Sequence, residues 1–410
     1  MTLVLPDPSE PELSVVMVTH GAWSLTERAV AALIARTEPI FELIVVDNDS
    51  NDETRAQLSA LRNARVILND KNEGFGPAAN RGAADARGEH LLLLNTDAFV
   101  EPGWLEPLRV TMQDPTVGAT VPRYLNPDGS LQDAGTLLAQ NGTVGIYGDG
   151  EHPDQLCYRF RRVVDSGAAA CMLLRRSLFE ALGGFDPRYA PAYYEDADLC
   201  MRIAQRGLSV VYEPRSTVTH MRYGSGGFDA AAELSERNRR LFVSRWASEL
   251  VGCPWTFEGS SAQAVIAARD ASATPRVLIA AGPEEPGVAE LARTLIRGWP
   301  RARVTWATHL DHGDGLDLDP WLALGIEVFD QTDVSWIADR LFHYDLAVLG
   351  SETDEHFLIA LDHTQPQAKS MSPTELDGPP ETRLPRLADT MASAGIALPT
   401  SKSSASAPSA

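Results

Sequence analysis

Short apolar runs alternate with amphipathic stretches along the first hundred residues of the chain. The apolar runs LSVVMV, ELIVVD, RVILN and HLLLLN lie at 13–18, 42–47, 65–69 and 90–95. Helices are expected between them, at 24–36, 52–63 and 77–87. The first contains SLTE, a match to a capping box formed by Ser24 and Glu27. Strands that alternate with helices predict βαβ units and a mostly parallel sheet, with ligands bound at the carboxyl ends of its strands.

The alternation is interrupted between residues 123 and 160. Turn formers there, PDG and NG, predict an irregular excursion or an antiparallel hairpin. Order resumes at Ser166–Leu174, and two further strands are expected at 208–214 and 216–220. A helix at 229–249 would close this unit. The pattern therefore predicts a first domain at 10–255.

A second strand–helix alternation begins after residue 275. Its expected strands lie at 276–282, 302–308, 325–330 and 344–350, and its expected helices at 287–298 and 333–342. This pattern predicts a small Rossmann-like α/β unit at 275–361. Residues 363–410 are rich in Pro, Ser, Thr and Ala and have few large apolar side chains, which predicts a disordered tail.

The charge and the cysteine content of the chain exclude several classes of protein. The chain of 410 residues carries 35 basic and 56 acidic residues, a net charge of −21. Such a balance argues against a nucleic-acid partner and against broad adhesion to an anionic membrane. The four cysteines follow no zinc or disulfide spacing. Since no signal peptide or membrane-spanning run is evident either, we expect a cytoplasmic protein, with peripheral contact at the inner membrane face still open.

Polar residues follow two of the expected buried strands. Asp47 ends the second strand, and Asn95, Thr96 and Asp97 follow the fourth. At one edge of a parallel sheet, such groups could bind a base or a ribose and hold a divalent cation. The alternative is that these residues only end strands, as Asn and Asp often do.

The segment YYEDADLCMR places three carboxylates, Glu195, Asp196 and Asp198, at the start of a helix. Acidic residues in a first turn can simply complement the helix dipole. However, neighbouring carboxylates repel one another, which can raise a pKa into the range of a general base. His220, which ends the strand STVTH, is either structural or a ligand for a metal or phosphate beneath the following Gly-Ser-Gly loop. The chain contains no P-loop and no G-x-G-x-x-G motif.

Taken together, these segments resemble the family 2 glycosyltransferases of the GT-A fold, in particular the bacterial rhamnosyltransferase-like branch. The likeness is carried, in the family's order over about 13–226, by VVMVTHGAWSLTERAV, LIVVDNDSNDET, NEGFGPAANRGAADARGEHLLLLNTDAFVEPGWL, GGFDPRYAPAYYEDADLCMRIAQRG and TVTHMRYGSG. The second unit faintly resembles the amino-terminal half of a GT-B glycosyltransferase. That half alone would not make a second active site, and acceptor binding, assembly and a remnant all stay open as its role.

The resemblance implies a role for each candidate residue. The donor nucleotide would be held by Thr19, Asp47, Asn48, Asn80, Asn95 and Thr96. Asp97 and His220 would hold Mg²⁺ or Mn²⁺, although Asn95 stands where the family's D-x-D begins with Asp. Asp196 would be the general base, with Glu195 as its catalytic partner and Asp198 and Arg202 in support.

The leading hypothesis is an inverting glycosyltransferase that moves a sugar from a UDP- or dTDP-linked donor to a hydroxyl of a glycan or glycolipid. The alternative is a catalytically silent module that binds a sugar nucleotide or glycan. A nucleotidyltransferase is disfavoured, because MVTHGAW carries no basic residue near the first strand. An oligomer is compatible with the sequence. The hypothesis requires Asp47, Asp97 and Asp196 to gather around one nucleotide-binding cleft.

Overall fold

The computed structural model describes residues 3–38, 40–222, 228–282, 285, 287–299, 301–310, 317–338, 343–351, 353–372, 385, 386, 388, 389 and 392. The chain folds into two compact units. The first comprises residues 1–154 and 163–265, and the second residues 155–162 and 266–410. These two units are defined by the contacts within the structure. The domain bounds 10–255, 275–361 and 363–410 remain predictions from the sequence.

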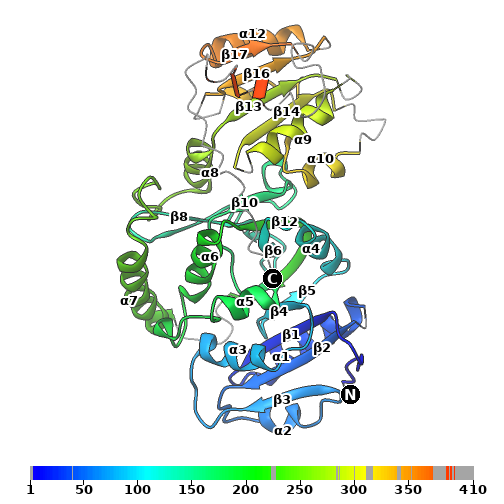
Figure 1. The fold of residues 1–410 in the computed structure, drawn as a ribbon, viewed down its shortest axis with the longest axis vertical. Coiled ribbons are helices and arrows are strands. Elements are labelled where there is room, and N and C mark those ends of the chain that lie inside the picture. The colour runs from blue at the N-terminus through cyan, green and yellow to red at the C-terminus, as the bar shows by residue number, and fades with distance from the viewer. Residues whose placement is uncertain are drawn as a thin grey trace. The chain divides into compact units, whose positions relative to one another are not determined.

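A mixed β-sheet forms the centre of the first unit. Its strands are β1 (Leu13–Thr19), β2 (Phe41–Asp47), β3 (Ala64–Leu68), β4 (His90–Leu94), β5 (Ala98–Val100), β6 (Val117–Leu125), β7 (Leu131–Asp133), β10 (Arg162–Val164), β11 (Cys171–Arg175) and β12 (Ser209–His220). Within the described residues the order is β10-β12-β6-β11-β4-β1-β2-β3, with β5 paired to β12 and β7 to β6 (Figure 1). A separate hairpin joins β8 (Thr136–Leu138) to β9 (Val144–Ile146), within the segment where a hairpin was expected.

The predicted βαβ region and the α/β fold class are confirmed. Strands β3, β2, β1 and β4 run parallel, and Thr19 pairs with Asp47 at the ends of β1 and β2. The central strands are apolar on both faces because helices cover both. Strand β11 interrupts the parallel order, since it is antiparallel to both β4 and β6.

Strand β12 differs from the sequence prediction of two separate strands. It is one strand of 12 residues whose register shifts between Glu213 and Thr217. Pro214 lies inside this shift and has no N–H to donate to a ladder, which explains why sequence reasoning divided the strand there. The irregularity is held by Glu213, which is buried and accepts hydrogen bonds from Thr111 Oγ1 (2.9 Å) and Arg215 Nε (2.8 Å).

The helices of the first unit are α1 (Trp23–Arg36), α2 (Thr54–Leu58), α3 (Phe75–Ala84), α4 (Leu105–Met112), α5 (Arg176–Ala181), α6 (Glu195–Gln205) and α7 (Phe228–Trp246), and α8 (Ala262–Ser272) follows them. The predicted capping box at Ser24 is wrong, because α1 begins one residue earlier and its N-cap, Ala22, makes no side-chain cap. Asp52 caps this end instead, since its Oδ2 accepts the Ala22 N–H at 2.9 Å.

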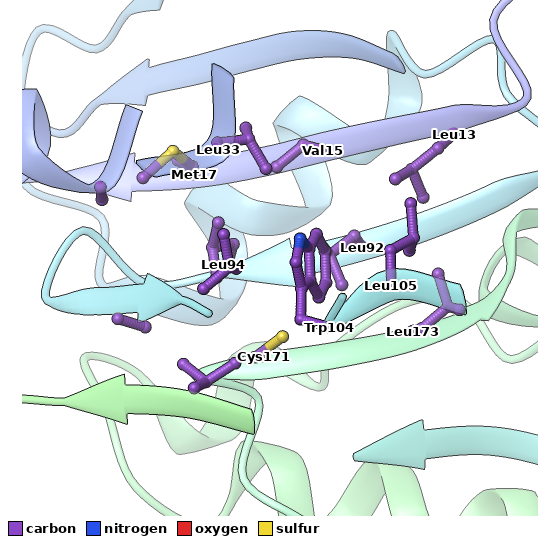
Figure 2. Close-up of a cluster of buried hydrophobic side chains, with 14 of the residues drawn as sticks. Leu13, Val15, Met17, Leu33, Leu92, Leu94, Trp104, Leu105, Cys171 and Leu173 are labelled. Carbon is purple, nitrogen blue, oxygen red and sulfur yellow. The ribbon is translucent and has the colours of Figure 1, made fainter. Parts of the chain in front are cut away.

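Apolar side chains fill both faces of the sheet. One face packs against α1 and the segment around Trp104, a fully buried side chain (Figure 2). Figure 2 shows Trp104 beside Leu92, with Cys171 of β11 on one side and Met17 of β1 on the other. On the opposite face, α3 approaches β1 so closely that a Cβ on Gly82 would lie 2.7 Å from Val16 Cγ1. This packing fixes the carboxyl ends of β1, β2 and β4, where the candidate residues lie.

The second unit is a smaller parallel α/β layer structure. Its strands are β13 (Arg276–Ala280), β14 (Arg303–Thr308), β15 (Glu327–Asp330), β16 (Leu346–Leu349) and β17 (Lys369–Met371). Its helices are α9 (Val288–Gly298), α10 (Asp319–Ala323), α11 (Ser335–Ala338) and α12 (Glu355–Thr364). The described strands are all parallel, in the order β15-β14-β13-β16-β17, with apolar clusters on both faces.

Strand β17 lies inside the segment that the composition suggested was a tail. It carries a single buried apolar side chain, Met371, so its three residues give almost no strand signal in the sequence. Most of the predicted tail, from residue 373 onward, lies outside the described residues. In the part of the chain that the structure describes, no helix has both the length and the apolar character needed to cross a bilayer.

Candidate active site

The carboxyl edge of the parallel strands brings several candidate residues together. Thr19 and Asp47 are register partners, and the Asn48 N–H donates to the Thr19 carbonyl at 2.7 Å. Strand β4, on the other side of β1, is followed directly by Asn95, Thr96 and Asp97. The expected clustering of the polar strand ends is therefore present in the backbone.

In Asp47, one carboxylate oxygen is held by an ion pair and the other has no hydrogen-bond partner among the described residues. Its side chain is fully buried, and Oδ2 accepts a hydrogen bond from Arg55 Nε at 2.6 Å. Its Oδ1 is also buried and has no hydrogen-bond partner among the described residues. Leaving a buried acceptor unpaired costs roughly 1–3 kcal/mol, so a ligand N–H or O–H that reaches Oδ1 would recover that cost.

The two neighbouring candidates, Asn48 and Asn80, use their side chains within the protein. Asn48 donates to Asn72 Oδ1 (2.8 Å) and accepts from Asn69 Nδ2 (2.9 Å), which orders the segment leading into α3. Asn80 exchanges two hydrogen bonds with the main chain of Phe185, at 2.8 and 2.7 Å. These contacts give both amides a role in positioning the loops, and leave little capacity for a donor nucleotide.

Asp97 and His220 face each other at the end of β4. Asp97 Oδ1 lies 3.3 Å from His220 Nε2, and both side chains are largely buried. The other ring nitrogen, Nδ1, lies 2.7 Å from Gln132 Oε1. The loop that follows His220 falls at 223–227, outside the described residues, so its proposed closure over a phosphate is not tested.

A divalent cation fits the chemistry of this pair. A carboxylate oxygen and an imidazole nitrogen are both ligands for Mn²⁺, whereas Mg²⁺ favours oxygen. The described residues contain no group of three or more His, Cys, Asp or Glu side chains arranged to hold a metal. The pair alone would leave most coordination positions for water and for a ligand such as a diphosphate.

Glu195 and Asp196 lie at the start of α6, after two tyrosines in a strained conformation. Tyr193 and Tyr194 have φ of 75° and 71°, a region that L-residues other than Gly, Asn and Asp rarely adopt. The fully buried Asn238 of α7 holds this turn, since its Nδ2 donates to the carbonyls of Tyr189, Ala192 and Tyr193 at 2.7, 2.7 and 2.8 Å.

The two carboxyl groups have perturbed acidities. Burial, and then the charge of Asp196, raise the pKa of Glu195 well above its ordinary value. Glu195 Oε2 is buried without a hydrogen-bond partner in the described structure. Burial also raises the pKa of Asp196, but the main-chain N–H groups of Ala197 and Ala169 stabilise its ionised form. These surroundings raise the pKa of Glu195 more strongly than that of Asp196, so they favour ionisation of Asp196 over Glu195.

The segment 168–171 links this pair to the strand-end residues. The main-chain N–H of Ala169 lowers the pKa of Asp196, and the Ala170 carbonyl accepts the Asn95 N–H at 2.9 Å. The buried Tyr124 hydroxyl lies 2.8 Å from both the Ala168 carbonyl and the Cys171 N–H. Two consecutive residues thus connect the carboxylate of Asp196 to the segment Asn95–Asp97.

Asp198 and Arg202, the expected supporting residues, anchor α6. Asp198 is fully buried and accepts from Trp246 Nε1 (3.0 Å) and Arg202 Nε (2.7 Å). Arg202 Nη1 also donates to the carbonyls of Leu182 and Gly184, at 2.9 and 2.8 Å. With these partners, both side chains position the helix that carries Glu195 and Asp196.

Sequence reasoning missed the buried amides that hold the site in place. Gln132 contacts His220, and Asn238 holds the turn before α6. Neither residue lies in a motif, and both come from segments expected to be irregular or merely helical. The only available signal was the uncharged Asn238 among the charged residues of ERNRR.

Comparison with known proteins agrees with this architecture. Residues 14–183 match the family described as Glycosyl transferase family 2. N-acetylglucosaminyl-diphospho-decaprenol L-rhamnosyltransferase of Mycobacterium tuberculosis is 30% identical over 281 residues, which cover 61% of this chain and 90% of that protein. An α/β sheet with a polar carboxyl edge and this sequence similarity define the class: a glycosyltransferase domain. The chain belongs to glycosyl transferase family 2, and the resemblance stated from the sequence is confirmed.

Other relatives are much longer than the aligned region. The O-antigen biosynthesis protein RfbC of Myxococcus xanthus is 32% identical over 260 residues, covering 61% of this chain and 20% of that protein. The uncharacterized protein y4gI of Sinorhizobium fredii is 29% identical over 246 residues, covering 57% of this chain and 27% of its own length. The chain thus spans about a quarter or less of these two relatives. Among solved structures, GalNAc-T7 with UDP, GalNAc and Mn²⁺ has a TM-score of 0.46 and 24% identity, and the match covers 56% of this chain and 48% of that one.

Proposed function

We propose that the chain is an inverting glycosyltransferase that moves a sugar from a nucleoside-diphosphate donor to a hydroxyl of a glycan or glycolipid, with Asp196 as the general base. The observation that carries the proposal is the Glu195–Asp196 pair, whose pKa values are raised by burial and which is joined through Ala169 and Ala170 to the segment Asn95–Asp97. A module that only binds sugar nucleotides would not need this pair.

The donor nucleotide is assigned to the strand-end residues. Asp47 Oδ1, buried and unpartnered, would accept a hydrogen bond from the base or ribose. Thr19 lies beside Asp47 in the sheet, and the segment Asn95–Thr96 follows β4 on the other side of β1. Asp97 and His220 would hold Mn²⁺ or Mg²⁺. A bound divalent cation supplies compensation for the negative charge that grows on the departing diphosphate.

The proton transfer is assigned to Asp196. Its carboxylate takes the proton of the acceptor hydroxyl as the oxygen attacks the anomeric carbon from the face opposite the diphosphate. One displacement inverts the configuration at that carbon. Glu195, which carries the shared proton, leaves Asp196 ionised, and general-base assistance of this kind is worth about 10²–10⁴-fold in rate.

The relatives suggest the kind of acceptor and donor. The mycobacterial relative is named for a lipid-linked sugar diphosphate acceptor and for rhamnose transfer. By this likeness we assign the chain a lipid-linked or polysaccharide acceptor and a UDP- or dTDP-linked donor. A glycolipid acceptor would place the protein at the cytoplasmic face of a membrane.

Turnover of candidate donors tests the proposal. The protein is incubated with Mn²⁺ and a panel of UDP-, GDP- and dTDP-sugars, with and without lipid-linked acceptors, and the released nucleoside diphosphate is measured. Acceptor-dependent release, with inverted configuration in the product, is the expected result. Tight donor binding without any release would instead support the silent binding module.

A further inference from the structure

Gln132 is a buried amide, only 3% exposed, that lies against the ring of His220. It belongs to β7, a short strand paired with β6. Its Nε2 donates to the main-chain carbonyl of His220 at 2.8 Å and to Asn126 Oδ1 at 2.9 Å. Its Oε1 lies 2.7 Å from His220 Nδ1. The same side chain therefore holds both the main chain and the ring of His220.

The main-chain contact fixes the orientation of the Gln132 amide. A carbonyl oxygen can only accept, so the atom of Gln132 that faces the His220 carbonyl must be the NH₂ group. Asn126 agrees with this orientation, because its own Nδ2 donates to Ser130 Oγ and leaves its Oδ1 free to accept. The Gln132 oxygen is left facing His220 Nδ1.

The amide orientation in turn fixes the proton on the imidazole. Gln132 Oε1 is an acceptor, so Nδ1 must donate at 2.7 Å and carries a hydrogen. In the neutral ring the lone pair then lies on Nε2. That atom faces Asp97 Oδ1 at 3.3 Å, and a carboxylate oxygen is also an acceptor. Two facing acceptors at this distance attract a shared proton or a cation.

We propose that Gln132 is a positioning residue that holds His220 as the Nδ1–H tautomer, so that His220 Nε2 and Asp97 Oδ1 together present two ligands to one divalent cation. The proposal deepens the proposed function, on which it rests, by naming the residue that prepares the metal pair. Residues that orient a metal-binding histidine in this way commonly change metal affinity about 10- to 100-fold when they are removed.

The first test reads the tautomer in the metal-free protein. The nine histidines are labelled with ¹⁵N, the His220 signals are assigned by their loss in His220→Gln, and spectra are recorded at about pH 8.5, where histidine side chains are ordinarily neutral. We expect the two-bond ¹H–¹⁵N pattern of the Nδ1–H tautomer. The Nε2–H pattern in the wild-type protein would overturn the proposal, whatever the variants do.

The second test measures the cation directly. Mn²⁺ is added without donor, and the broadening of the His220 ring signals is followed. In Gln132→Met, which lacks the acceptor, half-broadening should need about 10- to 100-fold more Mn²⁺ than in the wild type. Gln132→Glu keeps an acceptor oxygen toward Nδ1 but loses the N–H groups that face the His220 carbonyl and Asn126 Oδ1, so it should retain the Nδ1–H pattern alone. Gln57→Met, at an exposed position on α2, is the matched control and should behave as wild type.

The outcomes separate this inference from the proposed function. Unchanged Mn²⁺ broadening and an unchanged tautomer in Gln132→Met would overturn the role of Gln132 even if sugar transfer is observed. Wild-type signals that Mn²⁺ does not broaden would overturn the cation pair while leaving a metal-independent transferase intact. Conversely, Mn²⁺ binding that depends on Gln132 in a protein without transfer would support the inference and contradict the proposed reaction.

Discussion

At the scale of single residues, the adjacent carboxyl groups of Glu195 and Asp196 have different surroundings. Glu195 is buried with one oxygen unpartnered in the described structure, whereas Asp196 accepts the Ala197 N–H at 2.8 Å. Burial raises the pKa of both, and the pair holds its proton more readily on Glu195. In the proposed reaction this difference makes Asp196 the base and leaves the proton on Glu195.

Replacing the base tests this division. Asp196→Asn keeps the size of the side chain and removes its ability to accept a proton. We expect kcat to fall about 10²–10⁴-fold while the dissociation constant of the donor stays within a few-fold of wild type. Steady-state kinetics with donor calorimetry measure both. A variant that transfers sugar at a third of the wild-type rate or better would remove Asp196 from the role of base.

The acidity of Glu195 also makes a prediction about stability. A carboxyl whose pKa is raised by folding favours the folded state most below its unfolded pKa, and this contribution is lost as pH rises through the folded pKa. At neutral pH Glu195 therefore opposes folding. Glu195→Gln should raise the free energy of unfolding at pH 7 by on the order of 1 kcal/mol and flatten its decline with pH. Denaturant titrations between pH 4 and 8 check this prediction, and Glu180→Gln on α5, an exposed position whose ion pair with Arg176 contributes little, is the control.

At the scale of elements, α7 restrains the turn that precedes α6. One side chain, Asn238, places its NH₂ within hydrogen-bond distance of three carbonyls of a loop whose two tyrosines have left-handed backbone conformations, so its two hydrogens are shared among them. Strain of this kind persists only where surrounding contacts over-determine it. The position of Glu195 and Asp196 thus depends on a helix that lies more than thirty residues further along the chain.

Removing that contact should release the turn. Asn238→Ala leaves buried carbonyls unpaired, so we expect a loss of about 1–3 kcal/mol in the free energy of unfolding and faster amide exchange at 193–197. Arg240→Ala, on an exposed position of the same helix, is the control and should change stability little. Hydrogen exchange and denaturant unfolding measure the two effects. Unchanged exchange at 193–197 in Asn238→Ala would show that α7 does not restrain the turn.

For the first unit, the sequence patterns predicted which helices and strands exist more accurately than they predicted the residues at which these elements begin and end. The apolar runs located β1, β2, β3 and β4, because continuous burial leaves a strong composition signal. The cap of α1 was misplaced, since Asp52 reaches Ala22 from a distant loop. The same limit applied to the site. The candidate carboxylates could be recognised because they lie in sequence motifs. Gln132 and Asn238 could not, because they donate to main-chain carbonyls of residues that are distant in the sequence and become neighbours only on folding.

At the scale of the whole molecule, each unit has its own apolar core and buried charges. In the second unit Arg303 is 3% exposed and pairs with Glu327 and Asp270, which are also buried. Removing one partner from a buried ion pair typically costs about 3–5 kcal/mol, because the remaining charge stays unpaired. The second unit is therefore sensitive to a change that leaves the first untouched.

Calorimetry can separate the two units. Arg303→Met should lower the melting temperature of one thermal transition and leave the other at its wild-type position. Donor turnover at 25 °C should be unchanged, since the candidate site lies in the first unit. Arg301→Met, at an exposed position two residues earlier, is the matched substitution. A single transition that shifts as a whole would instead show that the units unfold together.

Strand β17 has a practical consequence for anyone who shortens this protein. Composition alone suggests trimming after Leu361, yet residues 369–371 are the lateral neighbour of β16. A fragment cut there would bare the main chain of LAVL, an apolar strand with no charge to discourage pairing with another copy. Such a fragment should self-associate, whereas one ending beyond residue 372 keeps β17 as the edge strand and β16 paired on both sides.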